Sequence, residues 1–317
     1  MGDHAHGCGH DHGEHGHDHH GHSHAPTSFG RAFLIGITLN TAFIFGEVIY
    51  GLKANSLALL ADAGHNASDV LGLVMAWTAV LVSKRLPSHR FTYGLHSSTI
   101  LAALANSIVL FVATGGIMWE ALLRLKHPTD ITGYTMIVVA TVGIFVNGVT
   151  AWLFMRGGKE DLNIRGAYLH MLADAMVSFG VVVAGFIILK THWLWLDPAV
   201  SVVIGMVIIF GTWHLLRDSL SLALQGVPAH IDLAKVKDFL MQRQGVKEVH
   251  DLHIWGMSTS ATVMSVHLVM PGGHPGDKAI RNIAHEMEEH FRIGHATIQV
   301  EVADESAECP LAPEHVV

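Results

Sequence analysis

Between residues 31 and 221 the chain is a succession of apolar segments, each long enough to cross a lipid bilayer as a helix. Charged and turn-forming residues interrupt them, as Lys84, Arg85 and Pro87 do after the second segment. Backbone groups in lipid must be hydrogen-bonded within their own element, which favours helices. We therefore expect residues 29–224 to form a membrane all-α bundle of six transmembrane helices. The expected spans lie near residues 32–52, 57–83, 97–123, 132–155, 164–190 and 196–220.

The composition agrees with a membrane protein and excludes several other classes. Only 15% of the residues are charged, against about 25% in ordinary soluble domains. The chain has 26 histidines, more than its 19 lysines and arginines together, and only two cysteines. These values exclude a nucleic-acid-binding protein, a disulfide-stabilised scaffold and a disordered chain. They indicate a protein whose partner is the lipid bilayer and which makes special use of imidazole.

The basic residues in the short loops predict the orientation in the membrane. An even number of spans places both termini on the same side, and lysines and arginines are enriched on the cytoplasmic side. The side of the termini carries Arg31, Lys84, Arg85, Arg90, Arg156, Lys159, Arg165 and Arg217, whereas the other carries Lys53, Arg124, Lys126 and Lys190. We therefore expect both termini in the cytoplasm.

The first 28 residues are predicted to be a disordered, histidine-rich cytoplasmic tail. Ten histidines alternate there with glycine and acidic residues, and the segment holds too few apolar residues to build a core. Imidazoles on a flexible strand bind zinc weakly and in numbers, so the tail is a candidate collector of cations. The alternative is that transport does not need it.

Residues 225–304 have the patterns of a soluble domain, and residues 305–317 are read as a C-terminal tail. A helix–strand–strand–helix–strand order favours a small α+β domain of the ferredoxin-like type. A domain of this size is marginally stable alone, so pairing with a second copy is plausible. The expected elements are a helix over 232–243, strands over 249–257 and 262–270, a helix over 275–291 and a strand over 296–302.

Two matched pairs of ionisable residues lie within the expected spans. His65 and Asp69 are four residues apart in the second span, as are His170 and Asp174 in the fifth. This spacing places each pair on one face of a helix. Two such helices facing each other would present two imidazoles and two carboxylates to one point, a set that suits a divalent cation and zinc above all. The alternative is that these side chains only hydrogen-bond neighbouring helices.

The chemistry of these four ligands also implies an exchange of metal for protons. Without metal, the imidazoles, with or without one of the carboxylates, would hold protons, which an arriving cation must displace. Other polar residues in the spans either line a water-filled approach or join helices by hydrogen bonds, and Asp62 could receive an entering cation. These residues are Asn40, Glu47, Asp62, Asn106 and Asn147.

Four segments carry a resemblance to a known family, the cation diffusion facilitators. They are SLALLADAGHNASDV at 56–70, GAYLHMLADAMVS at 166–178, VHDLHIW at 249–255 and HATIQVE at 295–301. The resemblance implies six transmembrane helices, a cytoplasmic ferredoxin-like domain and a homodimer. It also implies export of Zn²⁺ from the cytoplasm against H⁺, with both HxxxD pairs as the transport site. Family members tuned to manganese tend to have DxxxD at both places, so His65 and His170 favour zinc, with possible leakage of Cd²⁺ or Co²⁺. A bacterial inner membrane is the location that we expect.

The resemblance points to a second metal site in the cytoplasmic domain. Positions that match His250, His267 and Glu301 help relatives bind metal at the dimer interface, so Zn²⁺ is an expected structural ligand there. Some relatives have a further histidine where this chain has Gln299, and others use cysteines of the tail, of which only Cys309 is present. Whether the site holds one ion or two is therefore open, and the histidines could also be exposed without a role.

Three other functions compete with that of a proton-coupled exporter. A membrane metallohydrolase would need a motif such as HExxH, but the chain offers only His285 and His290, which are one residue too far apart. We therefore do not expect an enzyme. A membrane-anchored zinc sensor or buffer would leave the ionisable pairs in two separate spans unexplained. A passive channel for divalent cations is harder to exclude, because a tight cage of four ligands disfavours rapid flow without forbidding it.

Overall fold

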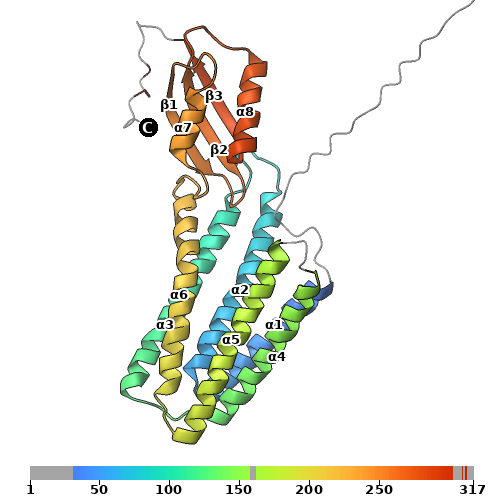
Figure 1. The fold of residues 1–317 in the computed structure, drawn as a ribbon, viewed down its shortest axis with the longest axis vertical. Helices are drawn as coiled ribbons and strands as arrows, with labels where there is room; N and C mark the ends of the chain where they lie inside the picture. The colour runs from blue at the N-terminus through green and yellow to red at the C-terminus, as the bar shows by residue number, and fades with distance from the viewer. Residues whose placement is uncertain (1–30, 158–161, 303–308, 310, 313–317) are drawn as a thin grey trace, which may run out of the picture.

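The computed structural model describes residues 31–157, 162–302, 309, 311 and 312, and Figure 1 shows its two parts. A bundle of long helices forms one part, and a small domain with a sheet sits at one end of it. The predicted architecture, a helical membrane bundle followed by a small α+β domain, is confirmed. The histidine-rich segment 1–28 lies outside the described residues.

Six helices form the bundle, at the places where the spans were predicted. Five of them, all but the first, contain a stretch long and apolar enough to cross a membrane. The first helix has 24 residues, about 36 Å at 1.5 Å per residue, and its membrane crossing stays a prediction. The helices are α1 (Arg31–Ala54), α2 (Leu57–Ser83), α3 (Ser98–Lys126), α4 (Gly133–Gly157), α5 (Leu162–Thr191) and α6 (Leu196–Ala223).

The bundle is apolar on its outside as well as in its core. Large side chains such as Phe45, Val112, Phe145 and Phe210 are mostly exposed on its surface. Soluble proteins rarely expose so much apolar surface, whereas lipid tails accommodate it. The core contains apolar side chains from all six helices, among them Leu59, Leu110, Met136, Val181 and Ile204.

A buried aspartate fixes the start of α2 against α6. At the N-terminus of α2, the Ser56 hydroxyl donates to Oδ1 of Asp197 at 2.5 Å, and the Leu57 backbone N–H donates to Oδ2 at 2.9 Å. The Ala58 N–H also donates to Oδ1, at 3.3 Å. Asp197 on α6 thus satisfies donors that a helix N-terminus leaves without a partner. This anchor lies two turns before His65 and so helps to set its position.

The C-terminal domain consists of α7 (Leu233–Met241), β1 (Glu248–Gly256), β2 (Thr262–Val269), α8 (Asp277–Phe291) and β3 (Ile293–Glu301). The sheet has the order β1-β2-β3, with β2 antiparallel to β1 and parallel to β3. Asp232 caps α7, because its carboxylate accepts from the Ala234 N–H.

One face of this sheet packs against both helices, and the other does not. Met264, Val266 and Leu268 alternate along β2 and share a core with Leu240 of α7 and Met287 of α8. Because successive side chains of a strand point to opposite faces, His267 lies on the face away from this core.

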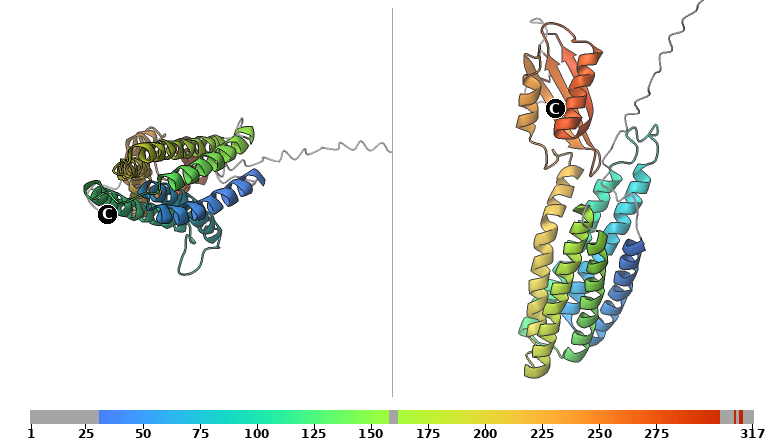
Figure 2. Two further views of the ribbon diagram at one scale, coloured as in Figure 1. Left: turned by 90° about the horizontal axis from the view of Figure 1, so that it is seen from below. Right: turned by 45° about the vertical axis from the view of Figure 1, so that its right-hand side comes forward.

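The two parts of the chain meet at the end of the bundle where α2 is joined to α3 (Figure 2). The Ser97 hydroxyl donates to the Met257 carbonyl at 3.3 Å, and the Thr259 N–H donates to the Thr99 hydroxyl at 3.1 Å. The turn between β1 and β2 is therefore hydrogen-bonded to the N-terminal end of α3.

Candidate metal centres

The structure brings the two HxxxD pairs together between α2 and α5. Within each helix, the histidine Nε2 lies 3.6 Å from an oxygen of its own aspartate. Between the helices, Nε2 of His170 lies 2.9 Å from Oδ2 of Asp69, and Nε2 of His65 lies 3.7 Å from Oδ1 of Asp174. All four side chains predicted for this site therefore converge.

These separations fit a small tetrahedral ion. Ligands placed 2.0–2.1 Å from a tetrahedral zinc are about 3.4 Å apart, and the four nitrogen–oxygen separations given above run from 2.9 to 3.7 Å. One ligand atom from each of His65, His170 and Asp174 lies within 4.8 Å of the others. These three side chains already lie close enough to share one cation, and Asp69, which contacts both histidines, has to shift toward Asp174 to complete the set.

The four side chains differ in burial. The side chain of Asp174 is only 4% exposed, against 41% for that of His170. Oδ2 of Asp174 and Nδ1 of His65 are buried atoms without a hydrogen-bond partner in the described structure. Buried polar atoms are almost always satisfied, so these two atoms mark a place where a ligand or proton is needed.

A cavity of about 790 Å³ gives access to these side chains. Its walls come from α2, α3, α5 and α6, and all four HxxxD side chains line it together with Asp62 and Asn106. Most of the remaining wall is apolar and includes Val203 and Val207 of α6. A cation in this cavity would find its polar partners concentrated at the HxxxD pairs.

The structure separates the other polar residues of the spans into groups. Asp62 and Asn106 line the cavity. Asn40 instead joins α1 to α4, because its amide donates to the Thr150 hydroxyl at 3.4 Å. Glu47 and Asn147 are fully buried, and their side chains have no hydrogen-bond partner among the described residues.

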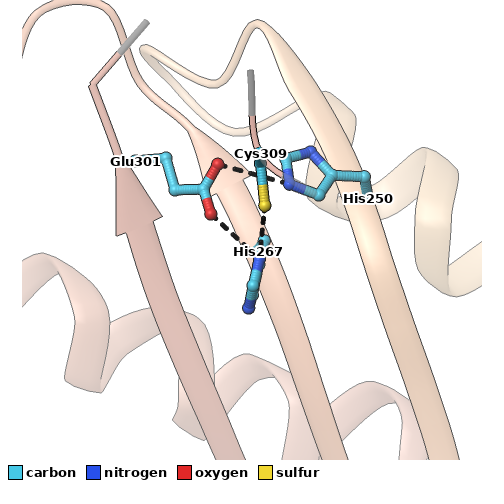
Figure 3. Close-up of side chains that lie close together, drawn as sticks. All are labelled: His250, His267, Glu301 and Cys309. Carbon is cyan, nitrogen blue, oxygen red and sulfur yellow. Dashed lines mark hydrogen bonds and ion pairs between the residues drawn. The ribbon is translucent and has the colours of Figure 1, made fainter. Parts of the chain in front are cut away.

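A second cluster lies at the sheet face away from the helices (Figure 3). Glu301 contacts both histidines, with Oε1 3.0 Å from Nδ1 of His267 and Oε2 3.3 Å from Nε2 of His250. Cys309 joins them, its Sγ 3.9 Å from Nδ1 of His267. One ligand atom from each of the four residues lies within 4.8 Å of the others. The predicted set of His250, His267 and Glu301 is thus brought together, with Cys309 as a fourth member.

Strand register produces this cluster. His250 is directly opposite His267 on the antiparallel pair, while Gln299 is opposite His267 on the parallel pair. Among the described residues, no hydrogen bond is seen between Gln299 and either histidine. Its amide donates to Oε1 of Glu301 at 3.0 Å and so holds the carboxylate in position.

Sequence reasoning did not identify Asp251 and His253 beside this cluster. Oδ2 of Asp251 lies 3.4 Å from Nε2 of His267, and Oδ1 lies 2.8 Å from Nε2 of His253. The pairing of β1 with β2 shifts between His250 and His253, and Asp251 has a positive φ of 50°. This bulge turns Asp251 toward the histidines, and strict strand alternation would not have predicted it.

The HExxH-like pair of the sequence belongs to neither of the two described clusters. His285 and His290 lie on α8 in the C-terminal domain. Among the described residues, neither belongs to a group of side chains close enough to hold a metal ion.

Comparison with known proteins matches nearly the whole described chain to one family. A model of the cation efflux transmembrane domain matches residues 33–222, and a model of the cation efflux protein cytoplasmic domain matches residues 228–303. The zinc transporter ZitB of Escherichia coli is 37% identical over 86% of this chain and 87% of its own length. The cadmium, cobalt and zinc/H⁺-K⁺ antiporter of Bacillus velezensis is 35% identical over 86% of this chain and 88% of its own.

One solved structure is similar to part of the chain. It is the metal-bound C-terminal domain of the CzcD transporter from Cupriavidus metallidurans, 33% identical to this chain. The match covers 23% of this chain and all of that one, with a TM-score of 0.20.

Proposed function

This chain belongs to the cation efflux family of membrane transporters, and we propose that it exports Zn²⁺ from the cytoplasm in exchange for protons. In this proposal His65, Asp69, His170 and Asp174 bind the transported ion. Cd²⁺ and Co²⁺ are expected as weaker substrates, in keeping with the Bacillus relative, which is named a cadmium, cobalt and zinc antiporter. A bacterial inner membrane with both termini in the cytoplasm is the expected setting.

The observation that carries the proposal is the convergence of two imidazoles and two carboxylates from different helices on one point inside the bundle. Ionisable groups are costly in a membrane and by default mark a functional site. A purely structural role would need one or two hydrogen bonds between helices, and here Asp174 and His65 each keep a buried atom without a partner. Nitrogen and oxygen ligands at tetrahedral spacing suit zinc.

The same geometry explains an exchange of zinc for protons. Without a cation, the short contact between His170 and Asp69 holds the two helices together through charge and hydrogen bonding. Zinc must take these atoms as ligands, which requires the imidazoles to give up their protons. Two protons on the imidazoles balance the two carboxylates as well as one divalent cation does. The net charge of the site is therefore the same whether it holds two protons or one zinc ion.

Transport also requires the cavity to open alternately to the two sides of the membrane. Residues of α6 form much of the apolar cavity wall, while the four ligands come from α2 and α5. Relative movement of α6 and α5 would change access without dismantling the ligand set.

The second cluster fits a structural zinc ion. His250, His267, Glu301 and Cys309 offer two nitrogens, one oxygen and one sulfur, a combination that zinc accepts. Both nitrogens of the buried His250 ring lack a hydrogen-bond partner in the described structure. Together with the uncovered face of the sheet, this supports a homodimer whose cytoplasmic domains are steadied by zinc.

Zinc movement against its own gradient separates the exporter from a channel. The full chain would be reconstituted in vesicles that contain a zinc indicator, and a pH difference would be imposed across the membrane. An exchanger accumulates zinc above the outside concentration while the interior is more acidic, and an ionophore that abolishes the pH difference stops the accumulation. A channel would only equilibrate zinc, and a sensor would not move it.

A further inference from the structure

A pair of acidic side chains lies inside the bundle but outside the proposed ligand set. Glu47 of α1 faces Asp62 of α2, and the two residues are 0% and 1% exposed. Asp62 also accepts a hydrogen bond from the Ser178 hydroxyl of α5 at 3.1 Å. We infer that Glu47 and Asp62 together bind one proton of the exchange, at a site separate from the four metal ligands. The inference rests on the proposed exchange of zinc for protons.

The hydrogen bonding of Glu47 points to a missing proton. Both of its carboxyl oxygens are buried and make no hydrogen bond of ordinary geometry, although the Asn66 side-chain amide lies close enough to act on the carboxylate. An ionised carboxylate only accepts hydrogen bonds, so two ionised carboxylates facing each other have no donor between them and repel each other. One proton on the pair supplies the donor and removes a buried charge, which a low-dielectric interior strongly favours.

In the described parts of the chain, no basic side chain takes the place of this proton. Helix α1 packs against α2 and α4, and the groups that act on Glu47 are Asp62, Asn66 and Asp174. None of these is cationic, and no ion pair of Glu47 or Asp62 with a lysine or arginine occurs in the described parts of the chain. The other titratable or charged groups on the described faces of these elements are Tyr50 and Lys53 on α1, His65 and Asp69 on α2, Tyr134 on α4, and Tyr168, His170 and Lys190 on α5, the last of these in the final turn of that helix.

The position of Asp62 couples this proton to the transported ion. Asp62 lines the same cavity as the HxxxD side chains, whereas Glu47 does not. Asp62 precedes His65 by three residues, about 4.5 Å along the helix axis. The pair therefore lies on the side of the metal site that faces away from the C-terminal domain. Two positive charges arriving nearby in a low dielectric favour loss of the proton, so zinc binding is expected to release it.

Zinc-induced infrared difference spectra of the purified full chain test this directly. The carbonyl stretch of a protonated carboxylic acid is resolved from carboxylate bands. We expect this band before zinc is added and its loss on zinc binding. In Glu47→Gln the zinc-induced loss of the band should be absent. Calorimetric titration in buffers of different ionisation enthalpy should then show about one proton fewer released per zinc, with zinc affinity within about threefold of wild type.

Two further variants keep the test decisive. Glu120→Gln removes a carboxylate on α3 that pairs with Arg124 at 2.9 Å, outside the metal cavity, and should change neither the band nor the proton count. Asp62→Asn should reproduce the effect of Glu47→Gln, and it decides the matter if the Glu47 variant does not fold.

The inference is overturned if wild-type protein shows no loss of the acid band with zinc, or if Glu47→Gln releases as many protons as wild type. A proton that stays on the pair when zinc binds would make it a structural contact. Failure of the proposed function looks different, because Asp174→Asn would then bind and transport zinc normally. If Asp174→Asn loses zinc while Glu47→Gln keeps its full proton count, only the proton pair is wrong.

Discussion

Nε2 of His170 on α5 lies 2.9 Å from Oδ2 of Asp69 on α2, closer than either histidine lies to the aspartate of its own motif. The strongest contact in the candidate site therefore joins two helices. A cation that takes both atoms as ligands replaces a direct contact between α2 and α5 with a shared bond to the metal. Occupancy of the site is thereby linked to how the two helices pack.

Exchange of both histidines for aspartate should change the metal preference. The double variant His65→Asp/His170→Asp presents only oxygen ligands, which suit manganese better than zinc. Zinc affinity is expected to fall by at least about tenfold relative to that for manganese. Competition binding with the purified chain measures the ratio, and His214→Asp on the exposed face of α6 is the control. An unchanged ratio would mean that the imidazoles do not bind the ion.

Removal of the charge on Asp197 should destabilise the bundle. In Asp197→Asn one acceptor oxygen becomes an N–H donor, so the contacts with Ser56 and the backbone of α2 cannot all persist. We expect a loss of about 1–3 kcal/mol and a lower thermal unfolding midpoint, followed by tryptophan fluorescence. Asp218→Asn, on the exposed side of the same helix, should have little effect. Equal shifts in both variants would refute the anchoring role.

The cytoplasmic cluster should contribute to zinc stoichiometry and to dimer stability. His267→Ala removes the side chain that contacts both Glu301 and Cys309. We expect about one zinc fewer per chain by equilibrium dialysis and weaker dimerisation by analytical ultracentrifugation. Cys309→Ser should have a smaller effect, and His230→Ala, an exposed histidine outside the cluster, should have none. Full zinc occupancy in His267→Ala would contradict a site here.

Deletion of residues 3–24 tests the role of the histidine-rich segment. A collector raises the local zinc concentration near the entrance, so its loss should raise the zinc concentration needed for half-maximal transport while leaving the maximal rate nearly unchanged. Initial rates in vesicles over a range of zinc concentrations give both quantities. No change in either would favour a dispensable tail, and complete loss of transport would mean that the tail does more than collect cations.

Sequence periodicity was sufficient for the parts of the fold that depend on local patterns. The apolar segments marked the helices of the bundle, and the spacing of His65 and Asp69 placed both on one helix face. The order of elements in the C-terminal domain also followed from alternation and capping. The last strand begins at Ile293 instead of residue 296. Only Arg292, with a φ of 58°, separates it from α8, and the nearby Gly294 lies within the strand and not in the turn.

Local sequence patterns did not predict the contacts between residues that lie far apart in the chain. Asp197 caps a helix 140 residues earlier in the chain, and nothing near Asp197 in the sequence indicates its partner. Asp251 reaches His267 through a bulge. The closer pairing of Asp69 with His170 depends on how α2 and α5 pack, which the repeated spacing within each helix does not determine.

The most direct test of the account is uphill zinc transport by Asp174→Asn in vesicles with an acidic interior. Asp174 is the most deeply buried of the four proposed ligands, and the amide keeps its shape while removing its charge. Zinc uptake by Asp174→Asn is expected to fall to the level of protein-free vesicles, while Glu120→Gln transports like wild type and both variants elute as folded protein. Wild-type accumulation of zinc by Asp174→Asn would contradict the assignment of the transport site.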